Sequence, residues 1–137
     1  MAITDTAAFA QTTKTGFATA TAASVITTAT PTNTIKIGTA GTDGAILTKL
    51  TAVPRATVTA SALYLFISKD TGTTKQLVDS ELMAAHTVAA TTAIPETAFT
   101  NITETVPIRI EAGDELYISS GVALASGIVF RAEWTDF

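Results

Sequence analysis

Apolar and polar residues alternate with a period of two along most of the chain after residue 34. The alternation is clearest at the C-terminal end, where Val129, Arg131 and Glu133 separate the apolar residues Ile128, Phe130, Ala132 and Trp134. This period is typical of β-strands that bury one face. Short strands separated by glycine-containing turns predict an all-β protein, an antiparallel β-sandwich or jelly-roll-like single domain.

The pattern of a β-strand is strongest in residues 57–68, and both faces of this predicted strand are apolar. A strand of this kind is covered on both sides, so one face should meet the core and the other a loop or a partner. We assign Tyr64 or Phe66 to the core, together with Ile108, Ile110, Leu116, Ile118, Phe130 and Trp134. The opposite face then supplies candidate partner contacts at Leu63, Leu65 and Ile67.

Two glycine-containing segments predict tight turns. In residues 69–73, Asp70 can cap a hairpin turn and Gly72 can adopt a positive φ. Ala112-Gly113-Asp114 predicts a second turn of the same kind. Residues 46–51 predict a regular strand, with Ile46, Thr48 and Leu50 on one face and Leu47, Lys49 and Thr51 on the other.

Two segments leave alternatives open. Residues 79–90 contain the run Leu82 to Ala85, which could form two helical turns or continue a strand, and we predict an irregular segment here. Residues 1–33 are rich in Thr and Ala and precede the domain expected at 34–137. They fit either an extended N-terminal arm that becomes ordered against a neighbour or an edge strand of the same domain. As an arm, this segment would contact a partner through Phe9 and Phe17.

The charge content changes the picture of the surface. Charged residues make up 15% of the chain, whereas a typical soluble domain has roughly 25%. Much of the surface must therefore consist of Thr, Ser and Ala, which are easier to desolvate than charged groups. We interpret this as a surface that other protein covers; a Thr-rich extracellular domain is the alternative.

The sequence also limits the classes of partner. The net charge of −4 and a pI near 4.7 argue against nucleic-acid binding, which favours a basic surface. The longest strongly apolar run is residues 63–67, far below the ~20 residues of a membrane helix. The first residues lack the pattern of a signal peptide, which predicts either assembly in a cytoplasm or secretion by a route that the sequence does not show.

Few residues are suited to catalysis or to metal binding. The chain has no cysteine and a single histidine, His86, so two-histidine and cysteine-based metal sites are excluded. Glu111, Asp114 and Glu115 could at most form a weak calcium site, and the loop 38–44 lacks the Gly-Lys-Ser/Thr ending of a phosphate loop. Asn101-Ile102-Thr103 matches a glycosylation sequon, which matters only in a secretory pathway. We predict no enzyme, no cofactor and no metal.

Two stretches carry a family resemblance: residues 57–78, with Tyr64-Leu65-Phe66-Ile67-Ser68-Lys69-Asp70-Thr71-Gly72, and residues 106–118, with Ile110-Glu111-Ala112-Gly113-Asp114. They resemble small β-sandwich virion proteins of tailed bacteriophages, most of all the decoration (cement) proteins of the capsid exterior. The resemblance implies binding to the major capsid protein, reinforcement of the shell and a homo-oligomer, often a trimer. It implies location in the virion, after assembly in the host bacterial cytoplasm.

Two other functions remain open from the sequence. A phage tail or head-fibre component would assemble with itself into tubes or fibres. A carbohydrate- or ligand-binding β-sandwich would need Tyr64, Tyr117 and Trp134 to form one exposed aromatic platform.

Overall fold

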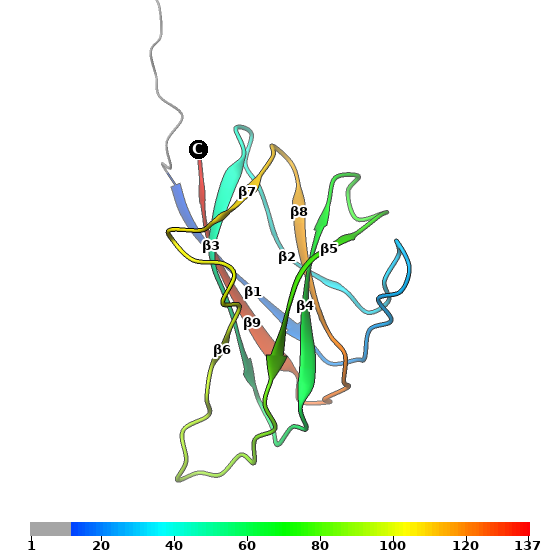
Figure 1. Ribbon diagram of the computed structural model, residues 1–137, viewed down its shortest axis with the longest axis vertical. Helices are drawn as coiled ribbons and strands as arrows, with labels where there is room; N and C mark the ends of the chain where they lie inside the picture. The colour runs from blue at the N-terminus through cyan, green and yellow to red at the C-terminus, as the bar shows by residue number, and fades with distance from the viewer. Residues whose placement is uncertain (1–11) are drawn as a thin grey trace, which may run out of the picture.

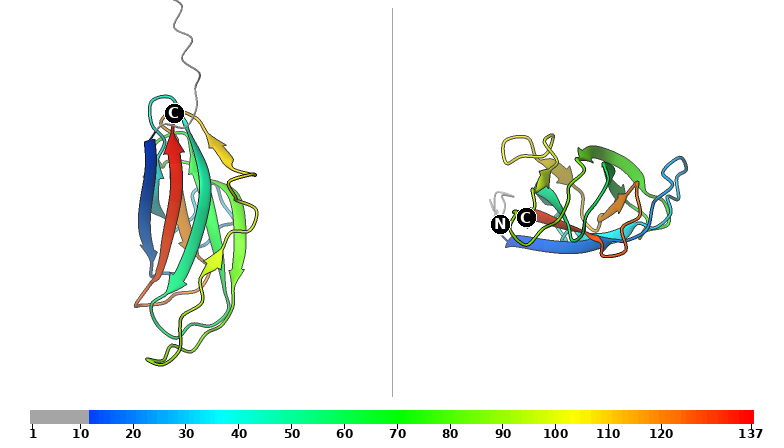
Figure 2. Two further views of the ribbon diagram at one scale, coloured as in Figure 1. Left: turned by 90° about the vertical axis from the view of Figure 1, so that its left-hand side faces the viewer. Right: turned by 90° about the horizontal axis from the view of Figure 1, so that it is seen from below.

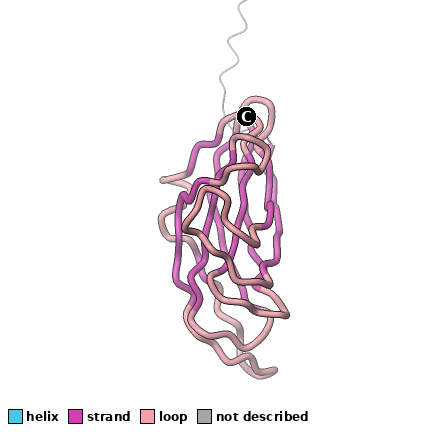
Figure 3. Tube along the Cα trace, turned by 90° about the vertical axis from the view of Figure 1, so that its right-hand side faces the viewer, coloured by secondary structure: helices cyan, strands magenta, loops and turns pink. Residues whose placement is uncertain are grey.

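The computed structural model describes residues 12–137, which form strands and no helix (Figure 3). The nine strands of this range are β1 (Thr12–Ala20), β2 (Ile35–Thr39), β3 (Ala45–Pro54), β4 (Ser61–Ser68), β5 (Gln76–Met83), β6 (Thr97–Ala98), β7 (Ile108–Ile110), β8 (Glu115–Ser120) and β9 (Ile128–Asp136). In the described part of the chain, no helix has the length and apolar character needed to cross a membrane.

The strands form two antiparallel sheets that pack face to face (Figures 1 and 2). Sheet A has the order β1-β9-β3-β6, with β7 also paired to β3, and sheet B has the order β2-β8-β4-β5. The pairs β1–β9, β2–β8, β3–β7 and β4–β5 are nested within one another along the chain, as in a rolled-up hairpin. This pairing is that of a jelly roll, so the predicted fold class is confirmed.

The core lies between the two sheets. β9 contributes alternate residues to it, as its sequence predicts: the four apolar residues are buried, while Val129, Arg131 and Glu133 face outward and are half-buried. Sheet B supplies Leu116 and Ile118 from β8, and β7 supplies Ile110. Ile108 packs against this cluster from its margin. These core assignments from the sequence are confirmed.

The predicted faces of β3 are wrong beyond Leu47. A register shift lies between Leu47 and Lys49 in the pairing with β9, which is the mark of a β-bulge at Thr48. Leu47 and Leu50 therefore both point into the core, and both are fully buried. Strict alternation cannot place two inward residues three positions apart.

The predicted faces of β4 are inverted. Leu63 and Leu65 are 0% exposed and belong to the core, and Ile67 packs against them, so these side chains are not available at the surface of this chain. Tyr64 and Phe66 lie on the outer face of sheet B, where Phe66 is nevertheless only 1% exposed. Because both faces of β4 are apolar, the sequence pattern could not tell which one meets the other sheet.

Two segments left open by the sequence have defined structures. Residues 12–20 form β1, an edge strand of sheet A that pairs with β9 over its whole length. The edge-strand alternative therefore describes this part of residues 1–33. The strand β5 extends to Met83, so residues 79–83 are strand and the prediction of an irregular segment is wrong there. Ala84 and Ala85 follow without regular structure, and the run forms no helical turn.

Both predicted turns are present. In the β4–β5 turn, Asp70 accepts hydrogen bonds from Thr74 N and Ser68 Oγ, and Gly72 has a φ of 91°. In the β7–β8 turn, Gly113 has a φ of 77° and Asp114 N donates to Glu111 O. Glycine is favoured at both positions because it adopts positive φ without a steric penalty.

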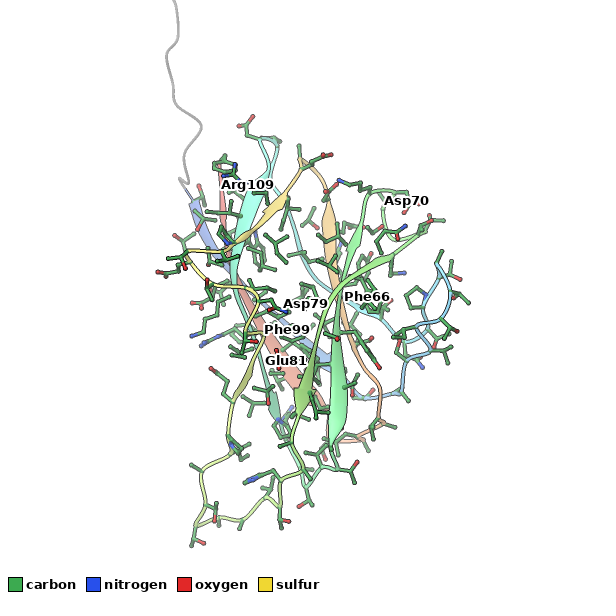
Figure 4. The ribbon with its side chains drawn as sticks, viewed as in Figure 1. Phe66, Asp70, Asp79, Glu81, Phe99 and Arg109 are labelled. Carbon is green, nitrogen blue, oxygen red and sulfur yellow. The ribbon has the colours of Figure 1, made fainter. Side chains whose placement is uncertain are left out.

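The two lateral seams of the sandwich are closed differently. At the β1–β2 seam, a Cβ added at Gly16 would collide with Ile37 O, and the ring of Trp134 lies against Gly16 and Gly38. At the β5–β6 seam, hydrogen bonds join the inner face of β5 to the segment after β6 (Figure 4): Glu81 accepts from Thr100 and Asp79 accepts from Asn101. Aromatic packing thus closes one side and polar contacts the other.

Truncation of a core aromatic residue of β9 tests this packing. We expect Phe130→Ala or Trp134→Ala to lower the free energy of unfolding by roughly 3–5 kcal/mol, because each leaves a cavity between the sheets. Thr135→Ala, on the opposite face of β9, is the matched control and should change it little. Denaturant unfolding measures the difference, and unchanged stability of Phe130→Ala would contradict the face assignment.

Candidate interaction surface

The outer face of sheet B is covered by the chain itself. Residues 21–33, which we call the strap, leave β1 and form the blue-to-cyan loop at the right of Figure 1. Ser24 N donates to Ser120 O at the end of β8, and Lys75 N, just before β5, donates to Ala29 O. The strap thus lies on the outer side of sheet B, the side that Phe66 and Ser119 face, and both residues are buried, at 1% and 0% exposed.

The strap is held in shape by its own hydrogen bonds. Ser24 Oγ donates to Thr32 O at 2.6 Å, and Val25 N donates to Thr32 Oγ1 at 2.9 Å. Asn33, which has a φ of 54°, donates from Nδ2 to Ala23 O at 2.7 Å. Pro31 is buried. These contacts close the two ends of the strap on each other, so the cover is a defined part of the fold.

Among residues 12–137, no segment covers the outer face of sheet A in this way. Figure 2 shows β1, β9 and β3 side by side on the side facing the viewer, with no segment crossing them. We call this surface the open face. The register pairs place one ladder of residues on it: Thr13, Thr15, Phe17 and Thr19 from β1, Val129, Arg131, Glu133 and Thr135 from β9, and Ile46, Lys49 and Val53 from β3. Hydroxyl groups and short apolar side chains predominate among them.

Phe17 is the most exposed large apolar side chain of the open face, at 64%. It lies opposite Arg131 of β9, next to Thr15 and Thr19 on its own strand and face. An isolated exposed phenylalanine on a flat, mostly neutral surface is a favourable anchor for a protein partner. The structure therefore places this predicted contact residue at the surface, whereas Phe9 lies outside the described residues.

A groove of about 850 Å³ lies at one margin of the open face. Its floor includes Ile46, Thr48 and Lys49 of β3, one wall includes Thr13 and Thr135, and the segment 98–104 forms the other wall. It exists because residues 99–107 leave β3 between its pairings with β6 and β7. The open face is therefore not flat at this margin, and a projecting loop of a partner could enter the groove.

The acidic cluster considered from the sequence is neutralised by lysines. Lys69 binds Asp114 at 2.7 Å and Glu111 at 3.1 Å, and Lys36 binds Glu115 at 2.8 Å. The hydrogen bonds that Lys69 donates to the carboxylates, first the one to Asp114, raise the pKa of Lys69 above its ordinary value. Among residues 12–137, no group of three metal-binding side chains stands close enough together to hold an ion.

Tyr117 extends this cluster on the outer face of sheet B. Its hydroxyl donates to Glu115 Oε1 at 3.1 Å, and Lys75 Nζ lies 4.8 Å from the centre of its ring. Burial, and then the bond to Glu115, raise the pKa of the tyrosine. The hydrogen bond from Lys36 lowers the pKa of Glu115. The network fixes the upper end of β8 against β2, a structural role.

The other residues considered for chemistry are far apart. His86 pairs through its backbone with Val58, and its side chain is half-buried. Trp134 is buried between the sheets, while Tyr64 and Tyr117 lie on the outer face of sheet B. The three aromatic residues therefore do not form one exposed platform.

Sequence reasoning missed a second exposed apolar region, on the edge strand β5. Leu77, Val78 and Leu82 are 47%, 41% and 65% exposed. The sequence feature that could have revealed this strand is the pair of acidic residues Asp79 and Glu81, which alternate with Val78, Ser80 and Leu82. The two acidic side chains face the inner side of the β5–β6 seam. That alternation could have extended the predicted strand to Met83.

No protein-family model matches the chain, and no curated protein or solved structure matches it significantly.

The Lys36–Glu115 contact predicts a pH dependence of stability. Because the folded pKa of Glu115 lies below the ordinary value of 4.5, its contribution to stability is complete above that value and is lost as the pH falls through the folded pKa. We expect the melting temperature of the wild type to fall more than that of Glu115→Gln between about pH 5 and about pH 3. Glu111→Gln, at an exposed position, is the control and should follow the wild type; equal slopes for all three would contradict the assignment.

Proposed function

We propose that this protein is a structural virion subunit of the decoration type, which binds the major capsid protein lattice on the capsid exterior and stabilises the shell. One observation carries the proposal: the described part of the chain, residues 12–137, covers one of its two sheets with the strap and leaves the other open (Figure 2). A fold that covers Phe66 so completely, yet leaves Phe17 exposed at 64%, fits a protein whose open face meets another protein.

The composition of the open face suits a permanent interface. Interfaces are depleted in charge at their centres, and neutral hydroxyl groups are less costly to bury than charged groups. A protein that binds only the assembled lattice stabilises it by mass action, in proportion to affinity and copy number. Many copies bound to one shell would therefore reinforce it without any catalytic group. Assembly would take place in the host cytoplasm, with the decorating species a homo-oligomer.

A tail or head-fibre component is the second candidate, and the free edge of β5 favours it. Edge strands with exposed apolar residues pair readily with other chains, and Leu77, Val78 and Leu82 are exposed there. A carbohydrate-binding role finds less support, because the aromatic residues that it needs lie on different sheets.

Binding to undecorated shells tests the proposal. The shells would be assembled from the major capsid protein encoded in the same genome. We expect Phe17→Ser to weaken binding by roughly 2 kcal/mol or more, as for a central aromatic anchor, and to leave the melting temperature unchanged because the side chain is exposed. Val25→Ser is the matched control, since Val25 is similarly exposed, at 57%, but lies on the strap.

Binding is measured by co-sedimentation with the shells, and two outcomes separate the possibilities. Equal binding by the Phe17 and Val25 variants would remove the open face from the contact. Failure of the wild type to bind shells, with tubes or filaments formed by the protein alone, would favour the tail or fibre candidate. Deletion of residues 2–10 tests the arm with Phe9 separately, because this deletion spares β1, whereas removing residues 2–30 would also remove a strand of the sandwich.

A further inference from the structure

Cationic side chains gather on the open face, although the chain as a whole has a net charge of −4. Lys49 projects from β3 opposite Glu133, Arg131 projects from β9 opposite Phe17, and Arg109 of β7 lies opposite Ile46. Three strands that are distant in sequence thus bring three cations to one surface. Among the outward-facing residues of β1, β3, β7 and β9 in the described part of the chain, Glu133 is the only carboxylate.

These cations are poorly neutralised within the chain. Among the described residues, Lys49 and Arg109 form no ion pair, and Arg131 reaches Glu96 only at 3.9 Å. The Nε atom of Arg131 is also buried without a hydrogen-bond partner. Away from the open face, three lysines form much shorter ion pairs with carboxylates: Lys14–Asp136 at 2.9 Å, Lys36–Glu115 at 2.8 Å and Lys69–Asp114 at 2.7 Å.

This contrast has a consequence for recognition. Most of the surface of an acidic protein repels an acidic partner, so a face with poorly neutralised cations sets the orientation in which the two can meet. A purely apolar partner would bury Lys49 and Arg109, which form no ion pair among the described residues, without compensation, and this is strongly unfavourable. A second copy of the same face would oppose cations to cations. Carboxylates of a different protein would be attracted to this face, would compensate the buried cations and would avoid the repulsion between two copies.

We propose that the open face binds an acidic protein surface, whose carboxylates pair with Lys49, Arg109 and Arg131 around the Phe17 anchor. This inference rests on the proposed function in one respect, that the partner is the capsid lattice. The chemistry of the partner follows from the open face alone. Glu133, in the middle of the face, and the small number of cations disfavour a nucleic-acid phosphate backbone as the partner.

The salt dependence of shell binding tests the ion pairs. We expect the double variant Lys49→Gln/Arg109→Gln to bind shells about tenfold or more weakly at low salt and to show a smaller loss of affinity as salt is added. The control Thr27→Glu/Thr73→Glu changes the net charge by the same amount on the strap and the β4–β5 turn, and should bind like the wild type. A double variant with wild-type affinity and salt dependence would overturn the inference.

A second measurement keeps the inference testable if the wild type does not bind shells, an outcome that counts against the proposed function only. An amide NMR titration with a 20-residue poly-L-glutamate should shift the signals around Lys49, Arg109 and Arg131, and the double variant should lose these shifts. Absence of shifts, or shifts centred on Lys36 and Lys69, would overturn the inference. Stronger shifts on the same face with a 20-residue oligothymidylate would also overturn it, in favour of nucleic acid.

Discussion

The structure depends on the need to cover both faces of β4. This strand carries Leu63 and Leu65 on one side and Tyr64 and Phe66 on the other, so a two-layer sandwich can bury only half of its apolar surface. The strap supplies the missing cover from outside. The fold is therefore locally three-layered over sheet B and two-layered over sheet A. That asymmetry, set by one strand, decides which sheet is left to meet a partner.

Where one face of a strand is buried and the other is exposed to solvent, the sequence was sufficient to predict which residues point into the core. β9 shows this best, because its small and charged outward residues leave a single possible orientation. The turns at Asp70-Thr71-Gly72 and Ala112-Gly113-Asp114 were equally readable, since few residues other than glycine accept a positive φ. Where both faces are apolar, as in β4, or where a bulge inserts one residue, as at Thr48, a period of two carries no information about orientation.

The candidate site was predictable only in part. Phe17 stood out because large apolar residues are rare in the first 33 residues, and it lies on the open face. The cations could not have been found in this way. Arg109, Lys49 and Arg131 are unremarkable in sequence, and only the register of β7, β3 and β9 places them on one surface. The same ambiguity affected the predicted partner contacts of β4. Because both faces of this strand are apolar, the sequence pattern predicted the wrong outer face, with Leu63, Leu65 and Ile67 on it.

The nested pairing of strands has a consequence for how the protein comes to exist in the cell. β1 has its hydrogen-bonding partner in β9, so the first and the last strand of the described residues pair with each other (Figure 1). Sheet A cannot close until β9 has been synthesised, and long-range pairing of this kind folds slowly. A truncated polypeptide would lack the central strand β9 and with it the open face. The topology thus makes the open face depend on β9: only a chain that includes this strand can present the surface by which it would join an assembly.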